Sequence, residues 1–195
     1  KGRIIFLQVH HFVFHHLFVL PAERNEPPDQ RGDDISQQEP VDEKDEPIGE
    51  MDKLEVHQKG LLHRAFSIFI FNDMNQLLLQ RRAKEKYHSA NLWTNTCCSH
   101  PQPSECSLEA AKRRLKEEMG IETNLEKKFD FIYQTKLDNH LIEYEFDHVF
   151  IGQYNQQPIL NPEEASDYKW ICIDELKADL ALFPEKYTEW LKIAI

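Results

Sequence analysis

The chain has 195 residues, of which 41% are hydrophobic and 29% are charged. These values are typical of a soluble globular protein with a single domain. The formal net charge of −11 repels nucleic acid and anionic membrane surfaces, so we expect neither as a partner. A polyanionic small molecule would need a local group of basic residues or a bound cation.

The first 40 residues lack the pattern of a packed domain. The apolar stretch from Ile4 to Leu20 is interrupted by Gln8 and by four histidines, so it is too polar to span a bilayer. We interpret residues 1–40 as a disordered or atypical N-terminal extension, with a metal-binding histidine cluster or a targeting segment as alternatives. Residues 21–50 are rich in Pro, Asp, Glu and Gln, a composition typical of a linker or disordered segment. The folded domain is therefore expected at residues 41–195.

The first elements of that domain form a predicted β-hairpin. Residues 65–71 are a β-branched and aromatic run, residues 72–75 are a turn signal, and residues 76–81 form a second strand. From residue 107 to residue 119, apolar side chains recur with a helical period, and Gly120 provides a stop.

The rest of the chain continues the mixed pattern. The expected elements are strands at 129–134, 144–151 and 168–171, a helix that starts at 174, and an amphipathic helix at 187–195. This order predicts an α+β fold, with mixed β-sheets and flanking α-helices.

The four cysteines, at positions 97, 98, 106 and 172, do not have the spacing of a disulfide framework. Two of them are adjacent, and adjacent cysteines do not readily bridge each other. Free thiols are typical of a reducing compartment, so we expect a cytoplasmic protein.

The segment from Trp93 to Pro101 concentrates the chemistry of the chain. It places the thiol of Cys98 two residues before the imidazole of His100, and a helix rich in carboxylates follows. Few purely structural segments combine these side chains.

A second set of residues has the chemistry of metal ligands. Three imidazoles and two carboxylates could occupy five positions around an octahedral divalent ion. The candidates are His57, His63, His100, Glu143 and Glu145. Glu143 and Glu145 are two residues apart in a predicted strand, so they share one face. Taken singly, each histidine is more often a packing or surface residue, and the glutamate pair is more often a solvated strand face.

The predicted helix at 107–119 carries a third pattern. Five residues separate Ser99 from Glu105, and seven residues separate Glu105 from Arg113. The run that begins there is Arg113-Arg114-Leu-Lys-Glu-Glu118-Met-Gly120. This pattern resembles the Nudix box, in which helix carboxylates hold magnesium against a diphosphate. Arg114 stands where that box has a glutamate, which argues against hydrolysis and suggests a phosphate contact. A charged helix face with Arg114 paired to Glu118 is the structural alternative.

These motifs together closely resemble the type I isopentenyl-diphosphate isomerases, a family with the Nudix fold. The resemblance runs from about Glu43 to Trp190. It is carried by the motifs at 60–66, 92–101 and 113–120, and by Glu143 followed by residues 144–147.

The resemblance implies a role for each matching residue. It implies a divalent metal, Mg²⁺, Mn²⁺ or Zn²⁺, on the three histidines with Glu143 and Glu145. It also implies a magnesium that accompanies the substrate diphosphate and is held by Glu118. The catalytic positions that match are Cys98, Glu145 and Tyr133. The matching diphosphate contacts are Lys53, Arg82, Lys86 and Arg114.

The implied reaction moves a double bond between isopentenyl diphosphate and dimethylallyl diphosphate through a tertiary carbocation. It needs one group that delivers a proton and one that removes a proton. Trp93 and Trp190 could present π faces to the cation, although core packing would also explain them. The alternatives are a Nudix pyrophosphohydrolase acting on a nucleoside diphosphate derivative, and a non-catalytic metal-binding or interaction module.

Overall fold

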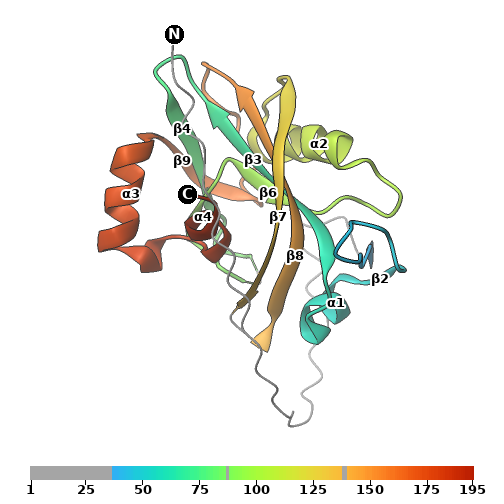
Figure 1. The fold of residues 1–195 in the computed structure, drawn as a ribbon. Helices are drawn as coiled ribbons and strands as arrows, with labels where there is room; N and C mark the ends of the chain where they lie inside the picture. Colours follow the sequence, from blue (N-terminus) through green and yellow to red (C-terminus); the bar gives the residue numbers. More distant parts are fainter. Residues whose placement is uncertain (1–36, 87, 138–139) are drawn as a thin grey trace.

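A computed structural model describes residues 37–86, 88–137 and 140–195 (Figure 1). The elements in chain order are β1 (Gln37–Gln38), β2 (Met51–Asp52), α1 (Lys53–Lys59), β3 (His63–Phe71), β4 (Gln76–Arg82), β5 (Trp93–Thr94), β6 (Cys97–Ser99), α2 (Ser107–Met119), β7 (Leu125–Lys136), β8 (Ile142–Gln153), β9 (Ala165–Cys172), α3 (Ile173–Leu182), the 3-10 helix η2 (Pro184–Lys186) and α4 (Glu189–Ala194). No helix among the described residues is both long and apolar enough to cross a bilayer.

Strand β3 forms the centre of a mixed sheet. It pairs in parallel with β8 along its whole length, from His63 opposite Glu145 to Phe71 opposite Gln153. On its other edge it pairs antiparallel with β6, where Ser67 lies opposite Cys98. Strand β7 then adds to β8 in antiparallel orientation. The predicted α+β fold with mixed sheets and flanking helices is confirmed.

The predicted hairpin of β3 and β4 is present, but its two strands separate immediately after the turn. Within the described residues, their register consists of Phe71 opposite Leu77. Strand β4 pairs instead with β9 and β5, which leaves the edge of β3 open for β6.

Side-chain alternation along β3 divides the core into two layers. Phe66, Ile68 and Ile70 pack with Leu115 and the other buried residues of α2. Phe69 points the other way and packs with buried residues of α4. Helix α2 accordingly lies on one side of the strands, and α3 and α4 lie on the other (Figure 1).

Helix α2 has the bounds that the sequence predicts. Its end is fixed by Gly120, which adopts a left-handed conformation with φ 64° and donates its N–H to the carbonyl of Lys116. A Cβ at this position would lie 2.8 Å from the side chain of Ile159, so both the backbone conformation and the space require glycine.

The segment 37–50 corrects the prediction of a linker or disordered segment. Gln38 and Val41 are buried, and Gln37–Gln38 pairs with Met51–Asp52. The guanidinium of Arg64 donates to Glu39 at 2.6 Å and to Asp45 at 2.7 Å. The prediction failed because these contacts join the segment to distant residues, which local composition does not reveal. Residues 1–36, which form most of the predicted extension, lie outside the described residues.

Candidate active site

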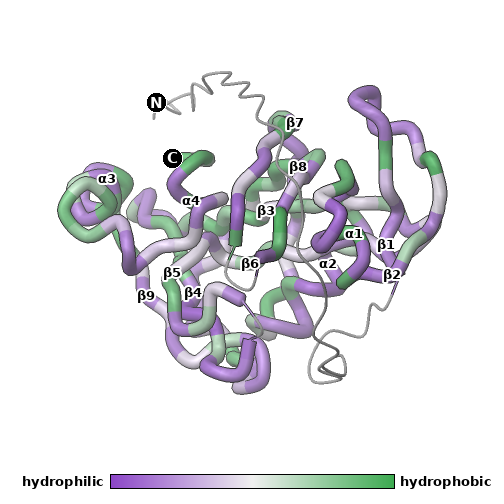
Figure 2. Tube along the Cα trace, turned by 90° about the horizontal axis from the view of Figure 1, so that it is seen from below, coloured by the Kyte–Doolittle hydropathy of each residue, from purple (hydrophilic) through white to green (hydrophobic). Residues whose placement is uncertain are grey.

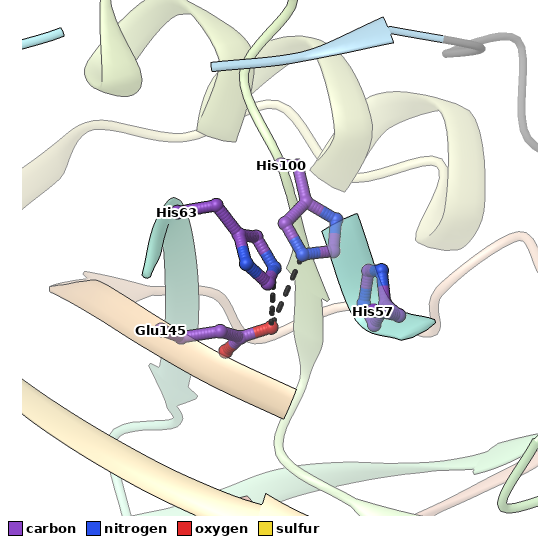
Figure 3. A group of neighbouring side chains, drawn as sticks. All are labelled: His57, His63, His100 and Glu145. Carbon is purple, nitrogen blue, oxygen red and sulfur yellow. Dashed lines mark hydrogen bonds and ion pairs between the residues drawn. The ribbon is translucent and has the colours of Figure 1, made fainter. Parts of the chain in front are cut away.

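Four of the predicted metal ligands lie together in the structure (Figure 3). His57, His63, His100 and Glu145 are all buried, and each offers one ligand atom within 4.8 Å of the others. They come from α1, β3, the residue after β6, and β8.

The sheet register explains how three of these ligands meet. His63 begins β3 and lies directly opposite Glu145 of β8. On the other edge of β3, Ser99 of β6 lies opposite Phe66, which brings His100 next to the beginning of β3. The two neighbours of β3 therefore place the carboxylate of Glu145, from β8, and the imidazole of His100, after β6, beside His63.

Helix α1 supplies the fourth ligand, and it begins and ends with clear capping contacts. The carboxylate of Asp52 accepts from the N–H groups of Leu54 at 2.9 Å and Glu55 at 3.3 Å. Gly60 ends the helix with φ 61°. This single short helix places His57 beside the sheet; in Figure 2, α1 lies with β1 and β2 on one side of the molecule.

The surroundings of His57 and His63 fit a metal ion. Their Nδ1 atoms lie 2.7 Å and 2.8 Å from the backbone carbonyl oxygens of Lys53 and Leu61. A carbonyl only accepts, so each Nδ1 carries the proton and each Nε2 keeps a lone pair. Both Nε2 atoms are buried without a hydrogen-bond partner among the described residues. Histidines that ligate metals are oriented by this same kind of carbonyl contact.

Burial also keeps these two imidazoles in the neutral form that binds metal. It lowers the pKa of His57 to about 4 and that of His63 to about 3, with the neighbouring His100 adding to both effects.

Tyr133 joins the two predicted carboxylate ligands. Its hydroxyl lies 2.6 Å from Oε2 of Glu145, to which it can donate, and 3.2 Å from Oε2 of Glu143. The other oxygen of Glu145 lies 3.1 Å from Nε2 of His100 and 3.9 Å from Nε2 of His63. Glu143 is therefore adjacent to the four-residue group through Tyr133 but is not one of its members.

A pocket opens beside this group and contains the predicted catalytic residues. Its lining includes Cys98, Tyr133, Glu143 and Glu145. Burial raises the pKa of the Cys98 thiol, although Arg82 acts in the opposite direction. The thiol therefore retains its proton at neutral pH.

Basic residues gather in the same pocket. The four predicted diphosphate contacts all line it, namely Lys53, Arg82, Lys86 and Arg114. Glu118 lies among them and accepts from Nη2 of Arg114 at 2.9 Å. The predicted pairing of Arg114 with Glu118 is thus present, inside the pocket rather than on an exposed helix face.

Three further residues of the pocket were not found from the sequence. Gln80 donates to Glu118 at 3.0 Å, Glu164 accepts from Arg114 at 3.0 Å, and His88 packs near Trp190. Glu164 follows another glutamate in the loop before β9, and no spacing distinguishes the two. The β-strand pattern of 76–81 predicted the position of Gln80 but not the contact.

The two tryptophans that were predicted to face a carbocation have different positions. Trp190 lines the pocket, and its Nε1 donates to Oγ1 of Thr94 at 2.7 Å. Trp93 is not part of the pocket lining, and Nζ of Lys169 lies 4.7 Å from the centre of its ring. Successive residues of a strand point to opposite faces, so the side chain of Trp93 points away from that of Thr94. That Trp93 faces the cation therefore stays a prediction.

The segment that resembles the Nudix box also contains a structural ion pair. Arg113 donates to both oxygens of Glu105, at 2.9 Å and 2.8 Å. This bidentate contact ties the loop before α2 to the helix, so only part of the motif faces the pocket.

Comparison with known proteins agrees with this geometry. The profile of the NUDIX domain matches residues 61–191. The Isopentenyl-diphosphate Delta-isomerase 2 of Aromatoleum aromaticum is 54% identical over 151 residues, which cover 77% of this chain and 80% of that protein. The Isopentenyl-diphosphate Delta-isomerase 2 of Photorhabdus laumondii is 55% identical over 152 residues, covering 78% of this chain and 86% of that protein.

Solved structures share the fold at lower sequence identity. A Deinococcus radiodurans crystal structure has a TM-score of 0.68 at 20% identity, covering 81% of this chain and 96% of that one. The MutT protein of Methanosarcina mazei has a TM-score of 0.54 at 20% identity, covering 68% and 89% of the two chains. The chain therefore belongs to the NUDIX domain family and, within it, to the isopentenyl-diphosphate Delta-isomerases.

Proposed function

We propose that this chain interconverts isopentenyl diphosphate and dimethylallyl diphosphate. The observation that carries the proposal is one pocket lined by the thiol of Cys98, a carboxylate beside a cluster of histidines, and several cations. The similarity to isomerases at more than half of the aligned positions supports the same activity.

The reaction determines what the pocket must contain. A proton adds to the terminal carbon of the alkene, the electron pair of the double bond forms the new C–H bond, and a tertiary carbocation remains. Loss of a proton from the carbon between the cation and the diphosphate arm then forms the new double bond. Two proton-transfer groups are needed, and no other reactant is consumed.

Cys98 and Glu145 are the residues proposed for these two proton transfers. They belong to β6 and β8, which flank β3. Tyr133 supports Glu145 through its contact of 2.6 Å and can pass a proton to it or take one from it. In the reverse reaction, the two residues exchange their roles.

A divalent metal is proposed at His57, His63, His100 and Glu145, and Glu143, which contacts Tyr133, is the fifth ligand that the resemblance implies. When bound, such an ion would fix the orientation of the Glu145 carboxylate and weaken its hold on a proton. Tyr133 keeps its contact with Oε2 of Glu145, whereas Oε1 is the oxygen nearest to the imidazoles.

The diphosphate is assigned to the part of the pocket that contains Lys53, Arg82, Lys86 and Arg114. These cations offset the net charge of −11 locally. Glu118 is proposed to hold the magnesium that accompanies the diphosphate, because carboxylate oxygens suit this ion.

Trp190 is proposed to stabilise the carbocation. An aromatic face near a desolvated cation contributes about 2 kcal/mol. The residue is 3% exposed and its Nε1 donates to Thr94, so we expect the ring to help exclude water from the pocket as well. Water must be excluded because it would capture the carbocation.

A Nudix pyrophosphohydrolase is the competing function, and the surroundings of Arg114 count against it. This side chain is buried and bound to Glu118, so a cation stands where the Nudix box has a carboxylate. The test is to incubate the purified protein and Mg²⁺ with isopentenyl diphosphate, with dimethylallyl diphosphate and, in separate reactions, with a panel of nucleoside diphosphate derivatives. We expect each isoprenoid to convert to the other without phosphate release. Release of phosphate or nucleoside monophosphate, with no isomer formed, would reject the proposal.

A further inference from the structure

Glu164 is a buried acid in a pocket that is assigned to an anionic substrate. Its side chain is 4% exposed, and it lines the pocket with Lys86 and Arg114. A negative charge at this position repels a diphosphate, so the carboxylate of Glu164 must contribute something that offsets this repulsion.

The backbone of Glu164 is held from two sides. Its carbonyl accepts from the N–H of Ala83, directly after β4, at 3.0 Å. Its own N–H donates to the carbonyl of Asn161 at 3.0 Å, and the N–H of Asn161 donates to the carbonyl of Glu118 at 2.9 Å. The short loop before β9 is thus tied both to the end of β4 and to the end of α2.

The carboxylate of Glu164 uses its two oxygens for two different cations. Oε1 accepts from Nη2 of Arg114 at 3.0 Å, and Oε2 pairs with Nζ of Lys86. The same Nη2 also donates to Glu118 at 2.9 Å. Lys86 comes from the loop after β4 and Arg114 from α2, so this one side chain links cations from two separate elements.

We propose that Glu164 is a positioning residue that fixes Lys86 and Arg114 in place before a diphosphate binds. This inference rests on the proposed function, which assigns both cations to the diphosphate. Lysine and arginine side chains lose many rotamers when they are held, and a rigid carboxylate removes this cost before binding occurs.

The positioning role and a simple charge effect predict opposite results for Glu164→Gln. If only charge mattered, loss of a buried negative charge would strengthen diphosphate binding. If Glu164 positions the two cations, KM for isopentenyl diphosphate should rise by about 10-fold to 100-fold, the scale expected when a binding group moves by about an ångström. We expect kcat to change much less, because Cys98 and Glu145 are untouched. An unchanged or lower KM would overturn the inference.

The neighbouring Glu163 provides a matched control. It is exposed, and Glu163→Gln removes the same charge one residue earlier, so its KM should equal that of the unaltered protein. Glu164→Asp provides a second variant if Glu164→Gln lowers the melting temperature. Its shorter side chain cannot reach both cations, so a normal KM in this variant would also contradict the inference.

Two further measurements separate this inference from the proposed function. Calorimetric titration with magnesium and inorganic diphosphate measures binding without any isomerisation, and Glu164→Gln should weaken it even if the protein proves not to be an isomerase. In a Lys86→Met background, Glu164→Gln should weaken binding less than it does alone, because one of its two partners is already gone. Fully additive effects would show that Glu164 does not act through Lys86.

Discussion

Two adjacent thiols in β6 lie in different environments because successive side chains of a strand point to opposite faces. Cys97 is fully buried in the core layer beneath α2, whereas Cys98 lines the pocket. This alternation gives each cysteine a separate expected role and provides an internal control for the proposed chemistry.

Replacing Cys98 should therefore affect turnover, whereas replacing Cys97 should mainly affect packing beneath α2 and the contact of this thiol with Glu118. We expect Cys98→Ala to lower kcat by about 10²-fold to 10⁴-fold or more, as loss of a positioned acid or base does. Cys97→Ala should leave kcat nearly unchanged and lower the melting temperature slightly. Steady-state kinetics with isopentenyl diphosphate, together with thermal unfolding, would test both variants. A large loss of kcat in Cys97→Ala alone would show that Cys97, and not Cys98, takes part in the proton transfer.

The sequence indicated the histidines, the carboxylates and the cysteine because their types and spacings are unusual. It did not indicate Glu164 or Gln80, because their importance depends on contacts with Arg114 and Glu118 across the fold. A motif also names a residue such as Trp93 without saying to which face of its strand the side chain points. Residue types thus indicate which side chains could take part in the chemistry of the site. The direction in which each side chain points depends on how the strands pair.

At the scale of elements, α2 was predicted accurately and α1 was missed. Helix α2 has 13 residues, a clear apolar stripe and a terminal glycine, all of which are local signals. Helix α1 has only 7 residues, too few to show a helical period, and such short helices are marginal in isolation. The separation of β3 from β4 was also hidden, because the pairing of β4 with β9 joins residues far apart in the sequence.

The cap of α1 provides a test of how this element positions His57. We expect Asp52→Ala to destabilise the protein by about 1 kcal/mol, the usual cost of losing a side-chain N-cap. It should also weaken binding of Zn²⁺ or Co²⁺ in a metal titration, because His57 lies in the middle of the helix.

Glu55→Ala is the matched control for this variant. It removes a carboxylate from the same helix turn, one whose Lys59 partner is largely exposed and contributes little. Equal metal affinity in Asp52→Ala and Glu55→Ala would show that the cap does not position His57.

At the N-terminal boundary of the domain, residues 37–40 pack with the rest of the chain, although the sequence placed them in the extension. We propose that residues before Gln37 are not needed for folding or turnover, whereas residues 37–42 contribute buried side chains and the contact between Glu39 and Arg64. A truncated chain that begins at Gln37 should keep its melting temperature and its turnover.

A chain that begins at Glu43 should be less stable, because Arg64 then loses Glu39 and the β1–β2 pair is absent. Thermal unfolding of the two truncated chains beside the full chain would measure the difference. If both truncated chains melted at the same temperature, the packing of residues 37–42 would not contribute to stability. A large loss of stability in the chain that begins at Gln37 would instead show that residues 1–36 belong to the domain.

Isomerisation requires the pocket to add one proton to an isoprenoid alkene and to remove another. Incubation with isopentenyl diphosphate and Mg²⁺ in D₂O, followed by NMR, tests it most directly. Because the thiol and carboxylate protons exchange with solvent, we expect dimethylallyl diphosphate with deuterium in its newly formed methyl group and no free phosphate. Release of phosphate or diphosphate without isomer, or an isomer that contains no deuterium, would contradict it.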